Sequence, residues 1–202
     1  MAQTLCIVLL VAGFATATPV RALAQGGPAR QLFEAGQYQQ AIDAATDTTE
    51  PQALYVAAQS RQKLGAIDEA RATYGQLAAR PDADVWHFIG LSGQQLLDDQ
   101  TDAALATAQQ AAAMADTLST AHYQVGLVLA KRRDWQRAAA AFDRAGELDP
   151  TDAYAHYYSG LMHYQARRPD LMAIQFEQFL TLAPDAPERP EVLQIMRTVR
   201  GR

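Results

Sequence analysis

Four histidines have the widest chemical repertoire in this chain of 202 residues. His122 and His156 are 34 positions apart, and equivalent positions of stacked repeats can bring two imidazoles to one metal ion. Each could instead occupy the half-buried packing site where Trp86 stands one repeat earlier. We favour packing, because none of the four, His87 and His163 included, forms a His-x-x-x-His or Glu-x-x-His pair on one helix.

Other arrangements that could support catalysis or bind a cofactor are weaker still. Asp98, Asp99 and Asp102 lie close together, but the glycine and the glutamate of a calcium loop are missing, so a solvated turn is expected. The chain has no nucleophile elbow, no phosphate-binding loop and no dinucleotide-binding glycine pattern. We therefore predict no catalytic residue, no metal and no cofactor.

An internal repeat is the strongest pattern in the sequence. Its members are separated by 34 positions: Gly126, Ala138, Phe142, Ala145 and Pro150 return as Gly160, Met172, Phe176, Phe179 and Pro184. His122, Val125, Gly126 and Leu129 form one apolar stripe of a helix. A self-match at this period predicts stacked helical hairpins.

These residues resemble the tetratricopeptide repeat, whose units place small and aromatic residues at fixed offsets. The resemblance covers about residues 28–200 and is sharpest in 119–184, although Met172 and Phe179 are bulkier than usual. It implies an all-α fold, an α-α superhelix of antiparallel hairpins. Gly90 and Ala104 are two positions further apart than Gly126 and Ala138, which predicts an insertion of two residues in the turn at 97–100.

The predicted domain organisation follows from this register. We expect one tetratricopeptide-repeat domain over 25–202, because solenoids need atypical units at both ends. Its parts are an N-terminal hairpin at 28–49, repeats at about 51–82, 83–116, 119–150 and 153–184, and a capping helix at 188–200.

The segment 1–24 reads as a secretory signal peptide. An apolar run at 5–14 is followed by Ala22-Leu23-Ala24, which predicts cleavage after Ala24, with Ala15-Thr16-Ala17 as a rival site. The run is too short for a membrane span, although an uncleaved anchor is the alternative. We predict an exported protein, periplasmic or secreted. Its only cysteine, Cys6, would leave with the leader, so the mature chain would have no disulfide.

Charge limits the choice of partners. Without the segment 1–24 the 17 basic residues become 16, against 22 acidic ones, so the net charge is −6. A mildly acidic surface argues against nucleic acid or an anionic membrane as the main partner. We expect a protein or peptide partner and no integral membrane span after cleavage, with oligomers possible.

The resemblance also implies a binding surface, because first helices build the concave wall in this family. Carried onto this sequence, one row of that wall reads Tyr55, His87, Tyr123 and Tyr157, flanked by Lys131, Tyr154 and Tyr164. Tyrosine offers a large, rigid contact area with a polar end. The alternative is that these rings only cover neighbouring methyl groups.

The predicted function is that of an exported, non-enzymatic scaffold that holds a peptide or protein segment in a concave groove, with cell-envelope assembly or secretion as a plausible setting. Aromatic and amide side chains there disfavour a clamp for acidic tails and favour a segment with apolar side chains. The alternatives are a structural or oligomerisation subunit of a larger envelope complex and, less favoured, a hydrolase or metal-dependent enzyme.

Overall fold

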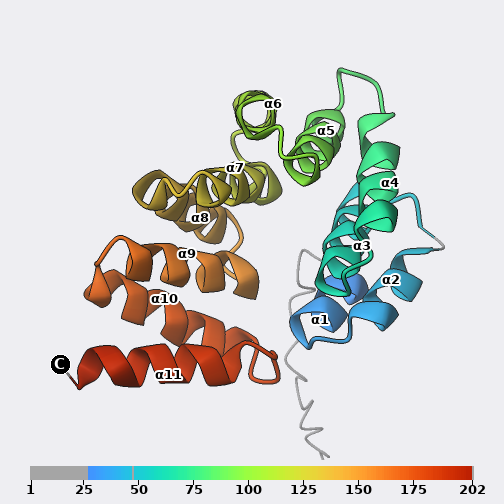
Figure 1. Ribbon diagram of the computed structural model, residues 1–202. Helices are drawn as coiled ribbons and strands as arrows, with labels where there is room; N and C mark the ends of the chain where they lie inside the picture. Colours follow the sequence, from blue (N-terminus) through green and yellow to red (C-terminus); the bar gives the residue numbers. More distant parts are fainter. Residues whose placement is uncertain (1–26, 47, 202) are drawn as a thin grey trace, which may run out of the picture.

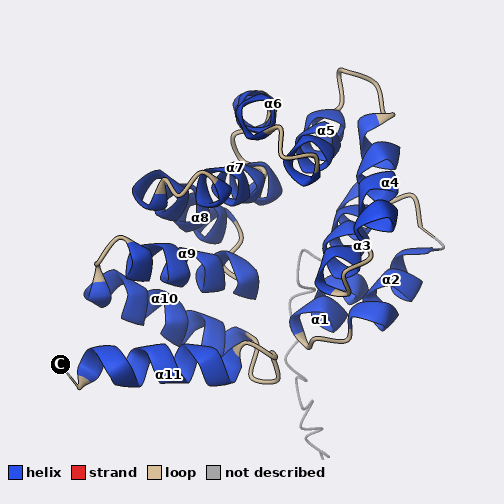
Figure 2. Cartoon of the chain, in the orientation of Figure 1, coloured by secondary structure: helices blue, strands red, loops and turns tan. Residues whose placement is uncertain are grey.

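A computed structural model describes residues 27–46 and 48–201, so the predicted leader at 1–24 lies outside the described residues. The described chain is helical throughout and contains no strand (Figure 2), which confirms the all-α prediction. Its helices are α1 (Gly27–Glu34), α2 (Tyr38–Thr46), α3 (Pro51–Lys63), α4 (Ile67–Ala78), α5 (Val85–Leu97), α6 (Thr101–Met114), α7 (Ser119–Lys131), α8 (Trp135–Leu148), α9 (Ala153–Gln165), α10 (Pro169–Leu182) and α11 (Arg189–Arg200).

The four central hairpins repeat at one constant spacing, without interruption. Their first helices begin at Pro51, Val85, Ser119 and Ala153, and their second helices at Ile67, Thr101, Trp135 and Pro169. The turn inside each hairpin contains one residue with positive φ, again at this spacing: Gly65, Asp99, Arg133 and Arg167. The backbone therefore repeats more regularly than the side chains do.

This regularity shows that the predicted insertion at 97–100 is wrong. The residue 34 positions before Gly126 is Ser92, not Gly90, and Ser92 is fully buried. Its hydroxyl donates to the carbonyl of Ala104 at 2.9 Å, so a residue larger than glycine is accommodated at the helix crossing. The register predicted for α5 was consequently shifted by two residues.

Close packing between paired helices forms the core. A Cβ added at Gly126 would lie 2.8 Å from the ring of Phe142, and one added at Gly160 would lie 2.5 Å from the ring of Phe176. Both rings are fully buried. Glycine is thus needed at these crossings because each phenylalanine occupies the space of a side chain.

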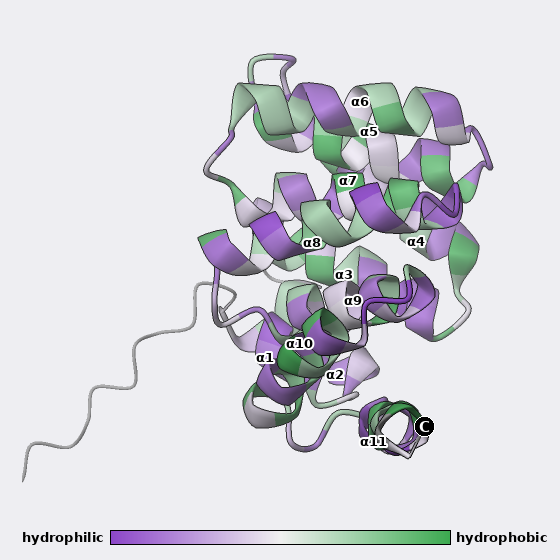
Figure 3. Cartoon of the chain, turned by 90° about the vertical axis from the view of Figure 1, so that its left-hand side faces the viewer, coloured by the Kyte–Doolittle hydropathy of each residue, from purple (hydrophilic) through white to green (hydrophobic). Residues whose placement is uncertain are grey.

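The hairpins follow an arc, with the first helices α3, α5, α7 and α9 on its inner side (Figure 1). The outer helices α6 and α8 mix hydrophilic and hydrophobic residues along their length (Figure 3). At the far end α11 packs on α10 and buries Val192 and Met196. None of the helices between Gly27 and Gly201 combines the length and apolar character that crossing a membrane requires.

Candidate functional site: the inner face

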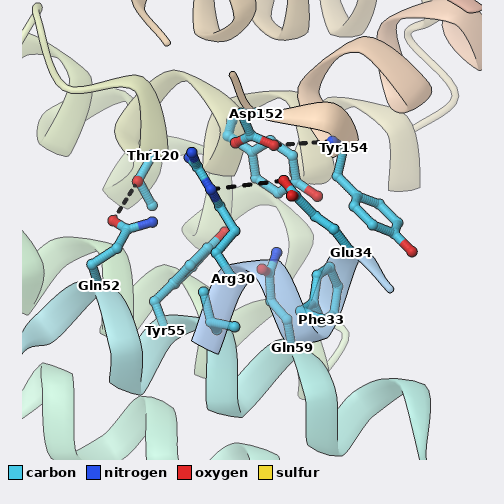
Figure 4. A pocket seen from close by; sticks show the side chains of 11 residues that line it. Arg30, Phe33, Glu34, Gln52, Tyr55, Gln59, Thr120, Asp152 and Tyr154 are labelled. Atoms are coloured by element: carbon cyan, nitrogen blue, oxygen red, sulfur yellow. Dashed lines mark hydrogen bonds and ion pairs between the residues drawn. The ribbon is translucent and has the colours of Figure 1, made fainter. Parts of the chain in front are cut away.

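The candidate site is the inner side of the arc, where α3, α7 and α9 converge. We use "inner face" for six of its side chains: Tyr55, Gln59, Thr120, Tyr123, Asp152 and Tyr154. They surround a cavity of about 20 Å³, and Figure 4 shows most of them together with the side chains of α1. That volume holds about one water molecule. At these side chains the inner face encloses a small cavity, where the sequence predicted an open groove.

Two predicted tyrosines, Tyr55 and Tyr123, face each other across this arc. Their rings meet edge to face, 6.5 Å between centroids, and both are almost fully buried. The Tyr55 hydroxyl donates to Oε1 of Gln124 at 2.9 Å, and the Gln124 amide donates to Ser92 at 3.1 Å. Burial raises the pKa of both tyrosines well above the usual value. These residues hold α3 against α7.

Tyr154 and Tyr157, expected on the same wall, are also buried. The Tyr154 hydroxyl donates to Glu188 at 2.7 Å, and the Tyr157 hydroxyl lies 3.5 Å from Glu191. Both carboxylates belong to the segment that begins α11. The sequence predicted that these rings line a binding wall, with packing as the alternative. In the structure all four tyrosines make packing contacts, many of them with rings of their own hairpin, such as Tyr123 with Phe142 and Tyr157 with Phe179.

The other predicted site residues lie elsewhere. Nδ1 of His87 is 2.6 Å from the carbonyl of Ala78, at the end of α4, and the residue in register with the tyrosine row is the buried Ile89. Lys131 is exposed and pairs with Asp99 at 2.7 Å. Tyr164 is 39% exposed, near the end of α9. His87 therefore does not belong to the row, and Lys131 and Tyr164 are exposed near the hairpin turns.

Helix α1 covers the inner face. Arg30 is only 5% exposed and donates to Asp149 at 2.5 Å and to the hydroxyl of Thr151 at 2.8 Å. The Phe33 ring lies 4.7 Å from that of Tyr154, between centroids. Glu34 accepts a hydrogen bond from the backbone N–H of Ala153 at 3.2 Å, at the start of α9.

Further contacts fasten the two ends of the arc together. Lys63 pairs with Glu188 at 2.7 Å, and its ammonium lies 5.3 Å from the centre of the Tyr154 ring. A Cβ added at Gly36 would lie 3.0 Å from Pro187. We call the contacts that α1, its turn and Lys63 make with residues 149–154 and 187–188 the seam. Sequence reasoning missed it, because its partners are more than a hundred positions apart.

The seam gathers three carboxylates around one guanidinium. Burial raises the pKa of Glu34 to about 7, helped by the nearby charge of Asp152 and opposed by Arg30. Burial likewise raises the pKa of Asp152. Burial also acts to raise the pKa of Asp149, but hydrogen bonds from Thr151 and Arg30 outweigh it and lower that pKa. The site is therefore acidic, and Arg30 is its central cation.

The histidines considered as ligands have protein partners. Nε2 of His122 is 2.9 Å from the carbonyl of Asp116, and Nδ1 of His156 is 2.7 Å from the amide oxygen of Gln175. His122 and His156 do occupy equivalent positions, but the preceding repeat has Phe88 there and not Trp86, because Phe88 precedes His122 by 34 positions. Within the described residues, no three His, Cys, Asp or Glu side chains are grouped to hold a metal.

Comparisons with known proteins agree with this architecture. Residues 119–152 match the tetratricopeptide repeat. A thermophilic tetratricopeptide-repeat protein of Thermus thermophilus is similar in structure, with a TM-score of 0.62 and 22% identity over 84% of this chain and 95% of that one. A search of curated protein sequences found no significant match.

Two further solved structures are similar at a TM-score of 0.50. One is YrrB, described as having an unusual peptide-binding site, with 19% identity over 86% of this chain and 89% of its own. The other is MamA, with 18% identity over 77% of this chain and 94% of its own. At these identities the likeness concerns the fold. Residues 119–152 are thus a tetratricopeptide repeat, and the described chain around them has the fold of tetratricopeptide-repeat proteins.

Proposed function

We propose that this protein is a non-enzymatic scaffold that binds a helical segment of a partner protein on its inner face. The supporting observation is that the inner face already holds a helix: α1 lies there with Arg30 and Phe33 buried. Stacked hairpins offer extended concave surfaces for such segments. A peptide-binding site is also described for YrrB, which has a similar fold.

We propose in addition that the protein is exported, to the periplasm or beyond. The basis is the apolar run at 5–14 followed by Ala22-Leu23-Ala24. N-terminal sequencing of the protein from its native envelope fraction tests this. Gln25 is the expected first residue; a protein that begins at Met1 in the cytoplasmic fraction would contradict export.

Position-specific photo-crosslinking in the native cell tests the binding site. A photo-reactive phenylalanine analogue replaces Gln59, which lines the cavity, or Gln136, which is exposed on α8 and serves as the control. We expect one discrete partner adduct from position 59 and none from position 136. Adducts from position 136 alone, or no adduct from either, would overturn the proposal.

A further inference from the structure

Besides its packing on α2 and α3, α1 contacts a seat before and at the start of α9 that has three chemically distinct parts. Its acidic part is formed by Asp149 and Asp152, its aromatic part by Tyr154, and its third part is the backbone N–H of Ala153 at the start of α9. Helix α1 supplies one side chain to each: Arg30, then Phe33, then Glu34. A cation followed three positions later by an aromatic residue is therefore the pattern that this seat accepts.

The seat holds α1 imperfectly. Nε of Arg30 is buried without a hydrogen-bond partner, and the carboxylate oxygen of Glu34 that pairs with it lies 3.7 Å away. Beyond the effect of burial, the charge of Asp152 raises the pKa of Glu34, so two acidic groups share this enclosed space. Buried charges with unmet partners contribute little net stability. The contacts of α1 are specific, but they are not optimised for strength.

Release of α1 would also break its packing on α2 and α3, and the backbone offers one hinge for that movement. The helix has eight residues, and its turn to α2 passes through Gly36, at φ +74°. Glycine has more conformational freedom there than other residues. Tethering gives α1 an effective concentration on the order of millimolar, which compensates for weak contacts. A free helix that fits the same seat better can compete with it.

Resting on the proposed function, we propose that α1 is a built-in competitor and that the partner segment is an amphipathic helix with the pattern basic-x-x-aromatic, which displaces α1 from the inner face. Apparent affinity is then reduced by the fraction of chains in which α1 is docked. Substitutions that weaken α1 should tighten partner binding, although they remove contacts from the structure.

A peptide with the sequence of residues 27–37 is the probe, labelled with a fluorophore and followed by anisotropy. It is titrated into the mature chain, 25–202, as wild type and as the double variant Arg30→Ala/Phe33→Ala. We expect binding to the variant to be at least ten times tighter than to wild type. The same peptide with alanine at its Arg and Phe positions should bind neither the wild-type protein nor the double variant. Equal binding to both proteins, or no binding to a variant that stays folded, would overturn the proposal.

A second measurement on wild type decides the matter if the double variant unfolds. Excess peptide should raise amide hydrogen exchange in residues 29–35 at least tenfold, because α1 is released. Peptide binding without this change would contradict displacement. So would a dimer formed by exchange of α1, seen by light scattering, because a second copy would then be the occupant.

These outcomes are separable from those of the proposed function. If the peptide fails while position 59 still captures a partner, the scaffold remains and its partner lacks the basic-x-x-aromatic pattern. If the peptide binds and displaces α1 while position 59 captures nothing, α1 does compete with such helices, but the inner face has no partner in the native cell.

Discussion

Arg30 of α1 and Asp149 at the end of α8 form a buried ion pair, although 119 positions separate them. Both side chains are 6% exposed. The pair joins the first helix of the described chain to the segment before α9, and it thereby closes the arc of hairpins over its own inner face.

Removal of the cation should weaken the seam strongly. Arg30→Met leaves Asp149 buried without its partner, and breaking a buried pair from one side costs about 3 kcal/mol or more. We expect the free energy of unfolding in urea to fall by about that amount. The matched control is Arg144→Met, whose pair with Glu147 is exposed. That variant should change stability by less than about 0.5 kcal/mol. Equal effects of the two variants would mean that α1 is not held through Arg30.

Stability should depend on pH through Glu34. Its pKa is about 7 in the folded protein and 4.5 as the reference value, so the folded state binds its proton more tightly. The stability contributed by this proton is complete below pH 4.5 and is lost as the pH rises through 7. The loss is on the order of 3 kcal/mol. Arg30, Asp149 and Asp152 face this carboxyl, and the lowered pKa of Asp149 places its own titration below this window.

Glu34→Gln should therefore be more stable than wild type at pH 8 and should lose this advantage toward pH 4.5. Urea unfolding of both proteins at several pH values gives the difference directly. A difference that stays constant between pH 4.5 and 8 would show that Glu34 titrates normally.

The tyrosines of the inner face should behave as core residues. Tyr123→Ala removes a ring that is 4% exposed. Truncation of a buried aromatic residue costs about 3–5 kcal/mol. The comparison is Tyr164→Ala, where the side chain is 39% exposed. Its loss should cost less than about 1 kcal/mol. Thermal or urea unfolding compares them, and similar losses for the two would contradict the burial of Tyr123.

Alanine at two helix glycines with equally close neighbours should change the stability of the protein in opposite directions. A Cβ at Gly126 or at Gly75 lies 2.8 Å from its nearest atom, but the first meets the buried Phe142 ring and the second the flexible end of Gln94. Gly75→Ala should be neutral or stabilise by up to about 1 kcal/mol, because alanine is the better helix former. Gly126→Ala should destabilise by about 1–3 kcal/mol. If Gly126→Ala is neutral, α7 and α8 are not in close contact.

The repeating turns give a further test. Arg133 has φ +61° where the equivalent residue of an earlier turn is Gly65, at φ +77°. A non-glycine residue in this region is strained by about 1 kcal/mol. Arg133→Gly should raise the free energy of unfolding by about that amount, and Gly65→Ala should lower it similarly. Stabilisation by Gly65→Ala would contradict the shared turn conformation.

The sequence was sufficient to predict the helical hairpins, because their period depends on local residues. Small residues at crossings, such as Gly126 and Gly160, recur with the aromatic rings that pack on them. The predicted register was wrong in α5, where a serine stands in place of that glycine. Ser92 fits at the helix crossing because its hydroxyl donates a hydrogen bond within the hairpin, and the spacing of the repeat does not reveal such a replacement. The error placed His87 in a row that belongs to Ile89.

The state of the inner face could not be predicted from the repeat pattern. Whether Tyr55 and Tyr123 are exposed depends on the curvature of the arc, which is the sum of small rotations at every hairpin interface. The contact of Arg30 with Asp149 arises only from that sum. The sequence identified these aromatic positions and left both binding and packing open as their role, and the repeat pattern alone did not decide between the two.

Photo-crosslinking from position 59 in native cells tests the central claim most directly, with and without Arg30→Ala in the same chain. The claim is that a partner helix occupies the inner face in place of α1. It predicts one partner adduct that becomes stronger when Arg30 is replaced, and no adduct from position 136. An adduct that weakens with Arg30→Ala, or that forms equally from both positions, would contradict it.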